Sequence, residues 1–378
     1  MVERLPPSGA GRWSFCPISP TLEAMFPEDD GPEAREGNAA HFYVMEALYG
    51  RFWPVNHVTP NGYPIDADMI TYGAKYIDDV REVFATLNIQ QGEDFSYCVE
   101  SPVAARAFIH PLLAGTPDTY LLLLSRKTLI LWDYKYGHGF VDPYRNKQCG
   151  SYVASILEGA GVPFDDIVNW KFEIRIVQPR NYHVEANGPV RTWTPNGTVM
   201  RTEIERLRTA AYKTQEPNAS AVTGPHCTHC KARLGCAAFL QTVGNAMDLA
   251  GAGLVREMSP GMLGSYLKML ATASERIKAA RDALDAQAIA YIRAGDTVPY
   301  FKMGFVNSHR KWRQPDADVI ATGKLLGHDL ASGKALTPAE AGKKGIDATV
   351  IEALSFKPSG AAKLIETDET AAAKAFGA

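Results

Sequence analysis

Long apolar segments are missing from this sequence of 378 residues. No run approaches the ~20 apolar residues that a helix needs to cross a bilayer, and residues 1–13 lack the apolar stretch of a signal peptide. We therefore expect a protein that stays in the cytoplasm, where structural disulfides are rare. The six cysteines consequently call for another explanation.

A strong excess of charge of either sign is also missing, since 39 Lys and Arg residues stand against 42 Asp and Glu residues. A DNA-binding role would therefore rest on local patches. The sequence also lacks a G-x-x-x-x-G-K-[ST] motif, so an unwinding motor of that type would be a separate protein. The composition, 46% hydrophobic and 21% charged residues, is typical of a soluble globular protein, and the length allows two domains.

One stretch in the first half of the chain carries the most informative pattern. Residues 120–124 and 128–132 are apolar runs separated by a polar turn, which predicts two strands folded back on each other. Acidic residues lie at both ends of this predicted hairpin, Asp118 before the first strand and Asp133 after the second. The pattern therefore predicts two carboxylates close to a buried sheet.

Lys135 follows Asp133 by two positions, so both side chains leave the same face of a strand. Two carboxylates that converge on one point repel each other unless a cation lies between them, and oxygen ligands suit Mg²⁺ or Mn²⁺. Such an ion acidifies water and offsets charge on a phosphate, while Lys135 would add positive charge beside the attacking water. A lone D-x-K favours a surface Asp/Lys pair instead, but the preceding Gly-Thr-Pro-Asp118 segment favours the metal site.

Three cysteines follow a loop of Pro, Asn, Ser and Gly with the spacing C-x2-C-x5-C: Cys227, Cys230 and Cys236. C-x2-C spacing lets two thiolates bind one metal centre from a tight turn, and this pattern is rarely accidental in a cytosolic protein. A four-coordinate site still needs one more ligand, for which Cys16 is the natural candidate. Zinc, with His226 or His229 as the fourth ligand, is the alternative. We assign Cys98 and Cys149 to packing.

The residues GTPD118 and D133-Y-K135 resemble the core motif of PD-(D/E)xK nucleases. Gln148 and Tyr152 match the Q-x-x-x-Y signature of the RecB-like branch, and a helix over residues 143–157, with Pro143 in its first turn, would place both on one face. The resemblance implies an α/β fold with a central mixed sheet flanked by helices. It also implies that Gln148 and Tyr152 look onto the active site and help to hold DNA.

The segment Glu36-Gly37-x-x-x-His41, on a predicted helix over residues 33–48, resembles the first motif of the same nucleases. The resemblance makes His41 a third metal ligand beside Asp118 and Asp133, and the carbonyl of Tyr134 joins them. Glu100 would lie near the site if it starts the sheet beside Asp118, but we favour a solvated edge residue.

The cysteine pattern, one cysteine upstream of the nuclease motifs and three downstream, resembles the iron–sulfur nuclease domain of AddB and the iron–sulfur nucleases of CRISPR adaptation. There, four thiolates hold a [4Fe–4S] cluster. The resemblance implies such a cluster on the four cysteines named above. It would join the N-terminal loop to the end of the nuclease domain and close a loop of about two hundred residues, which favours stability.

We predict a nuclease domain over residues 1–250 and an accessory helical or α+β region over residues 251–378. In the accessory region, basic residues surround Trp312 in residues 308–313, which suits either DNA contact or a solvated turn whose Trp packs on a helix. Residues 357–360 and the Ala-rich tail predict a mobile end. Further elements are predicted as follows: an ordered loop at 1–32, helices at 66–87, 198–213 and 261–294, and strands at 95–100, 104–109, 172–178 and 299–307.

The whole chain resembles a phage-encoded family of RecB-like nucleases of unknown function. The main hypothesis is a Mg²⁺- or Mn²⁺-dependent exonuclease of phage recombination or replication, which acts in the host cytoplasm and supplies single strands to an annealing or single-strand-binding protein. The alternatives are a DNA-binding module that kept the nuclease fold without the chemistry, and a structure- or site-specific endonuclease.

Overall fold

The computed structural model describes residues 4–26, 31–90, 93–181, 188–251, 259–307, 311–312, 316–330, 336–356 and 359–366. They fall into two units, Met1–Ala273 and Ser274–Ala378, which we describe separately. No helix among these residues is both long and apolar enough to span a membrane.

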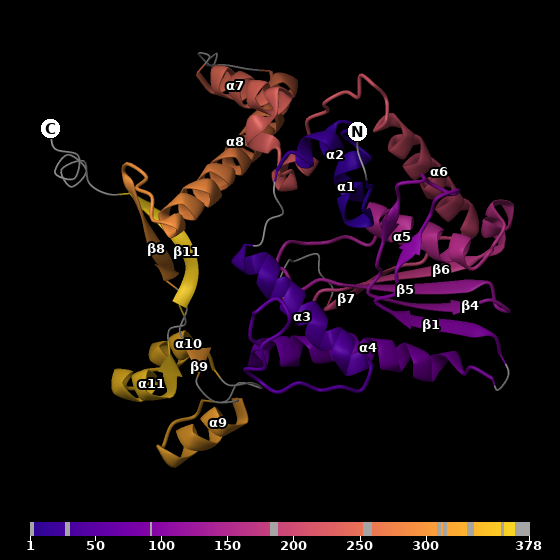
Figure 1. Ribbon diagram of the computed structural model, residues 1–378. Coiled ribbons are helices and arrows are strands. Elements are labelled where there is room, and N and C mark those ends of the chain that lie inside the picture. The colour runs from indigo at the N-terminus through magenta and orange to yellow at the C-terminus, as the bar shows by residue number, and fades with distance from the viewer. Residues whose placement is uncertain are drawn as a thin grey trace. The chain divides into compact units, whose positions relative to one another are not determined.

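A five-stranded mixed sheet forms the centre of the larger unit (Figure 1). Its order is β1-β4-β5-β6-β7, and only β5 and β6 are parallel. The strands are β1 (Phe95–Val99), β4 (Thr119–Leu123), β5 (Thr128–Tyr134), β6 (Lys171–Val177) and β7 (Val190–Trp193). The predicted hairpin is confirmed as β4 and β5, and β5 runs two residues further than expected, through Asp133 to Tyr134.

Helices cover both faces of this sheet (Figure 1). The helices α3 (Pro32–Leu48) and α4 (Ala67–Leu87) pack on one face, where alternate residues of the hairpin, such as Leu121 and Trp132, are buried. The helices α5 (Lys147–Gly159) and α6 (Gly197–Lys213) pack on the other, against residues such as Leu122 and Leu131. Because both faces are covered, every residue of β4 is buried. The predicted α/β class with a mixed sheet between helices is confirmed.

Asparagine and aspartate side chains set the starts of these helices. Asn146 accepts a hydrogen bond from Cys149 N, Asn196 from Val199 N, and Asp66 from Met69 N. The helix predicted over residues 143–157 therefore begins at Lys147, and placing Pro143 in its first turn was wrong because Asn146 caps the helix three residues later. The predicted helices over 33–48, 66–87 and 198–213 are confirmed to within a residue.

Other boundaries differ from the sequence prediction. The first strand ends at Val99 because Glu100 has a left-handed φ of 49°, which breaks the extended chain. Of residues 104–109, only Ala104 belongs to a strand, the two-residue β2 (Val103–Ala104), which pairs with β3 (Ala114–Gly115). The N-terminal region is not a plain loop, because it contains η1 (Pro7–Gly9), α1 (Ala10–Trp13) and α2 (Ser19–Glu23). Trp13 anchors it in the core.

The rest of the larger unit lies just before β6 and after α6. It comprises η2 (Phe164–Asn169), η3 (Pro225–His229), η4 (Arg233–Gly235), α7 (Ala237–Gly251) and the first part of α8 (Pro260–Ala294). The predicted strand over 172–178 and the helix over 261–294 are confirmed, each starting one residue earlier than expected.

The smaller unit contains the end of α8 and two short antiparallel ribbons, β8 with β11 and β9 with β10. Its elements are β8 (Phe301–Asn307), β9 (Lys311–Trp312), α9 (Asp316–Leu325), α10 (Pro338–Lys343), α11 (Ala348–Leu354), β10 (Ser355–Phe356) and β11 (Ser359–Glu366). The mobile end predicted from residue 357 is wrong for β11, while residues 357–358 and 367–378 lie outside the described residues.

Trp312 belongs to the small core of this unit, packed against Val319 and its neighbours, and its indole donates a hydrogen bond to Leu336 O at 2.6 Å. A ring held in this way favours the packing alternative over base stacking. The other basic residues of the predicted cluster, at 308–310 and 313, lie outside the described residues.

Gly197 permits a close approach between α6 and η2. A Cβ at this position would lie 2.5 Å from the carbonyl carbon of Val168 and closer still to Ile167 O. We expect Gly197→Ala to lower the free energy of unfolding by about 3 kcal/mol, because backbone atoms would have to shift. Urea denaturation measures this loss. Gly37→Ala is the control, since nothing lies within 4 Å of a Cβ there, and alanine should stabilise α3 by about 1 kcal/mol. A Gly197→Ala protein as stable as wild type would contradict the packing described.

Candidate functional site

Three strand ends meet at one edge of the sheet. Asp118 immediately precedes β4, and its Oδ2 accepts a hydrogen bond from Tyr134 N, at the end of β5, at 2.6 Å. Its carbonyl accepts a hydrogen bond from Glu100 N, just past β1, at 2.9 Å. The segment that begins with Gly115 is therefore tied to the strands on both sides. The Tyr152 ring packs closely against this segment, because a Cβ on Gly115 would lie 3.2 Å from the ring.

Asp133, Lys135 and Gln148 form a closed set of contacts. Lys135 Nζ donates to Asp133 Oδ1 at 3.1 Å and to Gln148 Oε1 at 3.2 Å, and Gln148 Nε2 donates to Asp133 Oδ1 at 3.0 Å. Burial disfavours the charged form of Lys135, but attraction to Asp133 and Asp118 outweighs it and raises the Lys135 pKa, so the amine is an ammonium ion. The structure thus brings together three of the residues predicted from the sequence.

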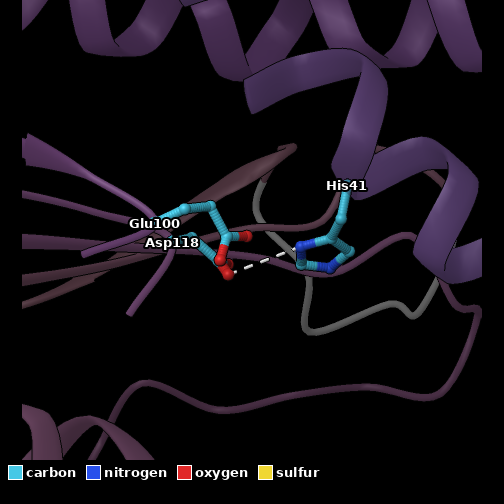
Figure 2. A group of neighbouring side chains, drawn as sticks. All are labelled: His41, Glu100 and Asp118. Carbon is cyan, nitrogen blue, oxygen red and sulfur yellow. Dashed lines mark ion pairs between the residues drawn. The ribbon is translucent and has the colours of Figure 1, made fainter. Parts of the chain in front are cut away.

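His41, Glu100 and Asp118 form a second group beside the first. One ligand atom from each lies within 4.8 Å of the other two, and His41 Nδ1 is 3.4 Å from Asp118 Oδ1. Figure 2 shows the imidazole and both carboxylates converging. Burial favours the protonated form of Asp118, but the interaction with His41 outweighs it and lowers the Asp118 pKa. A residue of α3 is thereby joined to the sheet edge.

Glu100 is exposed, in agreement with the favoured edge residue, but it also lies beside Asp118, as the alternative required. Partial burial of its carboxyl and repulsion from Asp118 raise its pKa, and Figure 2 shows this carboxylate turned toward Asp118. The available signal was strand pairing: Val99 is opposite Thr119 in the antiparallel pair of β1 with β4. The residue after Val99 must then lie beside the residue before Thr119, which is Asp118.

Other predicted residues have supporting positions. Tyr134 lies with its ring edge-on to His41 at 5.2 Å between centroids, in addition to the backbone contact with Asp118. Tyr152 is buried, and a hydrogen bond to Gln148 opposes the rise in its pKa that burial causes. The Tyr152 hydroxyl therefore contacts the Gln148 side chain.

The donor set suits a divalent ion. The group of His41, Glu100 and Asp118 offers two carboxylates and one imidazole, which are ligands for Mn²⁺ and, through oxygen, for Mg²⁺. Asp133 lies outside this group of three, but its Oδ2 is a buried oxygen that accepts no hydrogen bond within the described part of the chain, although it pairs ionically with Lys135 Nζ at 2.9 Å. The Lys135 ammonium offsets the cost of burying this carboxylate, and a divalent ion beside it would do so further.

The four predicted cysteines line one pocket of the larger unit: Cys16, Cys227, Cys230 and Cys236. Cys16 follows α1, while Cys227 lies in η3, Cys230 directly after η3 and Cys236 directly after η4. Two sulfurs accept backbone hydrogen bonds at 3.4 Å, Cys16 from Val222 N and Cys227 from Gly224 N. Burial raises the pKa of Cys230 to about 11, so a metal centre would have to displace its proton.

The histidines beside this pocket are poor candidates for the fourth ligand. His226 lines the pocket, but its Nε2 lies 2.8 Å from Val222 O and its ring stacks on Phe15. His229 is not among the residues that line it. The structure thus brings Cys16 to the same pocket as the other three cysteines, and four thiols are the donor set of an iron–sulfur cluster.

A loop that the sequence analysis passed over connects β5 to α5 beside the acidic site. The buried Gln178 amide donates to the carbonyls of Gly137 and Gly139, and its oxygen accepts hydrogen bonds from Arg191 and Val141 N. The amide thus uses both of its protons and both acceptor positions. Gln178, just after β6, and Arg191, in β7, therefore hold the loop in one conformation. By itself the loop could adopt many backbone conformations, because it contains two glycines.

Glu203, a buried carboxylate in α6, pairs with three cationic side chains, one of which lies at the start of α5. Glu203 Oε2 is 2.9 Å from Lys147 Nζ, and its Oε1 is 2.6 Å from Arg206 Nη1 and 3.5 Å from Arg145 Nε. Burial opposes ionisation of Glu203, but its hydrogen bond to Lys147 and the charges of Lys147, Arg206 and Arg145 outweigh this and lower its pKa. Three cations around one carboxylate leave positive charge in excess.

We expect Glu203→Gln to lower the free energy of unfolding by about 2 kcal/mol at pH 7, the usual value of hydrogen bonds to a charged group. Because the folded-state pKa is lowered, this contribution is present above the ordinary pKa of 4.5 and is lost as the pH falls through the folded value. Urea denaturation at pH 7 and pH 3 should show a smaller pH effect in the variant than in wild type. Glu205→Gln, whose exposed carboxylate pairs with Arg201, should change stability little; equal losses in the two variants would contradict this assignment.

Comparison with known families places the chain by sequence. A family model with the description "Protein of unknown function (DUF2800)" matches residues 3–371. The match includes the acidic site, all four clustered cysteines and the smaller unit up to residue 371. This chain therefore belongs to the DUF2800 family, whose function is unknown.

Proposed function

We propose that this protein is a metal-dependent nuclease that hydrolyses DNA phosphodiester bonds, with a PD-(D/E)xK core of the RecB-like type. The observation that carries the proposal is the contact set of Asp133, Lys135 and Gln148 at a sheet edge where Asp118 and His41 also meet. Two carboxylates and an ammonium group on adjacent strand ends suit phosphoryl chemistry, because one kind of group binds a divalent ion and the other attracts the phosphate.

Each residue has a distinct task in this proposal. Asp118, His41 and Glu100 would hold Mg²⁺ or Mn²⁺ together with the Asp133 carboxylate, and the carbonyl of Tyr134 remains a further expected ligand. When bound, the ion supplies an acidified water and offsets phosphate charge. Lys135 keeps its positive charge at neutral pH and would orient the water or the scissile phosphate. Gln148 holds the Lys135 ammonium in place, and Tyr152 holds Gln148.

The cysteine pocket supports a [4Fe–4S] cluster as the second cofactor. Four thiols, that of Cys16 among them, line one pocket, and ligation by cysteines alone is typical of iron–sulfur clusters. The cluster's ligands would join Cys16 to the segment that follows α6, and the backbone N–H groups on Cys16 and Cys227 would donate to their thiolates.

We infer an exonuclease of phage recombination or replication, which would deliver single strands to an annealing or single-strand-binding protein. The test is digestion of end-labelled linear duplex, single-stranded DNA and closed circles by anaerobically purified protein, with Mg²⁺, Mn²⁺ or EDTA. Degradation of linear DNA alone, abolished by EDTA, is the expected result. Cleavage of closed circles would identify an endonuclease, and DNA binding without cleavage would identify a silent DNA-binding module. Undiminished cleavage in EDTA would reject the proposal.

A further inference from the structure

An exposed aromatic side chain lies at the end of the loop between β5 and α5. Tyr144 is 57% exposed, although its ring is supported at the back by Trp193, with 5.6 Å between centroids and an interplanar angle of 68°. Trp193, in β7, itself packs against the main core. The Tyr144 ring is therefore largely exposed to solvent and in contact with a residue that the core fixes.

The backbone around Tyr144 is held in an uncommon conformation. Tyr144 N donates to Asp142 Oδ1 at 2.8 Å, and Asn146 Nδ2 donates to Asp142 O at 3.1 Å. Between them, Arg145 has a left-handed φ of 51°, which is strained for a residue with a side chain. This conformation places the Arg145 guanidinium 5.3 Å from the centre of the Tyr144 ring.

Positive charge is in excess beside the ring. Arg145 and Lys147 share one carboxylate, Glu203, with Arg206. Arg145 is 43% exposed at its side chain, so it can contact a ligand without leaving Glu203. A flat ring beside an exposed guanidinium, with the half-buried Lys147 ammonium three residues further along the chain, is complementary to a nucleobase with its phosphate.

This surface is close to the proposed active site along the chain. Tyr144 precedes Gln148 by four residues, which span at most about 14 Å. Gln148 contacts both Asp133 and Lys135. A nucleotide that stacks on Tyr144 would therefore be near the scissile phosphate.

On the basis of the proposed nuclease function, we propose that Tyr144, supported by Trp193, stacks an unpaired base of the DNA strand that enters the site, while Arg145 and Lys147 bind an adjacent phosphate. The inference deepens that function by naming its substrate as a strand with unpaired bases. Paired duplex keeps its bases stacked on one another and cannot use this ring.

The test measures binding of the full-length protein to a labelled single-stranded DNA 20-mer and to the same sequence as duplex. Fluorescence anisotropy in EDTA keeps the DNA intact. Tyr144→Ala should weaken binding of the single strand by about 10-fold, as loss of base–aromatic stacking does, with duplex binding unchanged. Tyr144→Phe keeps the ring and should bind as wild type. Arg145→Ala should reduce the slope of log affinity against log salt by about 0.7, the value for one phosphate of a single strand.

Tyr212→Ala is the matched control, because Tyr212 is 54% exposed and its ring also lies edge-on to another ring, that of His110, at 4.8 Å. Equal single-strand affinities for wild type and Tyr144→Ala, equal losses in Tyr144→Ala and Tyr212→Ala, or no binding of single strands by wild type would each overturn the inference.

Failure of this inference can be distinguished from failure of the nuclease proposal. If Tyr144→Ala selectively weakens single-strand binding but the wild-type protein does not cleave DNA in Mg²⁺ or Mn²⁺, the stacking surface alone is supported. Metal-dependent cleavage with unchanged Tyr144→Ala binding supports the nuclease alone.

Discussion

Replacing Lys135 with methionine is expected to reduce the rate of DNA cleavage by about 10³-fold, equivalent to about 4 kcal/mol of transition-state stabilisation. Methionine keeps the length and apolar stem of the side chain but removes the only ammonium group that contacts Asp133 and Gln148 in the described structure. The charge of Lys135 is retained at neutral pH because its pKa is raised, so its loss removes a full positive charge beside the reacting phosphate. Asp118→Asn should be at least as damaging, because it removes a carboxylate that contacts His41.

Lys127→Met is the matched control for this experiment. Lys127 lies at the opposite end of the β4–β5 hairpin and also pairs with a carboxylate, Asp166, at 2.7 Å. The pair is exposed, so its removal should change stability by less than about 1 kcal/mol and leave cleavage unchanged. Rates are measured on linear duplex with Mn²⁺ at saturating protein, and circular dichroism verifies folding. Cleavage by Lys135→Met at the wild-type rate would remove Lys135 from the reaction.

Replacing Cys16 with serine is expected to abolish binding of the iron–sulfur cluster and to destabilise the larger unit. The four thiols come from two segments, since Cys16 follows α1 and the other three follow α6. A link between Cys16 and Cys227 closes a loop of about 200 residues, for which chain-entropy arguments give a stabilisation of up to about 5 kcal/mol. Loss of one of four ligands should therefore lower both iron content and the urea midpoint.

The measurement is bound iron and visible absorption of anaerobically purified protein, followed by urea denaturation. Cys98→Ser is the control, because Cys98 lies in β1 and not among the residues that line the cysteine pocket. It should retain wild-type iron. Stoichiometric zinc in the wild-type protein would redirect the assignment to a zinc site, and unchanged iron in Cys16→Ser would show that Cys16 is not a ligand.

The sequence predicted the hairpin well because its signal is local. Two continuous apolar runs, residues 120–124 and 128–132, separated by a short polar turn favour two buried strands. A two-residue separation places Asp133 and Lys135 on one face of a strand regardless of the rest of the fold. Helix boundaries were harder to predict where both a proline and a capping residue are typical of a helix start, as Pro143 and Asn146 are. The structure of the smaller unit was the hardest to predict from the sequence, because β8 and β11 pair residues that are far apart along the chain.

By itself, the sequence determined which chemical groups lie on the hairpin and on the Gln148–Tyr152 helix face, since periodicity over a few residues is enough for that. Only the tertiary structure decided that Glu100 joins His41 and Asp118, that Gln178 holds the loop before α5, and that Tyr144 rests on Trp193. The physical reason is that these contacts depend on which strand ends meet and which helices pack on which face. Burial of the whole sheet decides both, and no short segment contains that information.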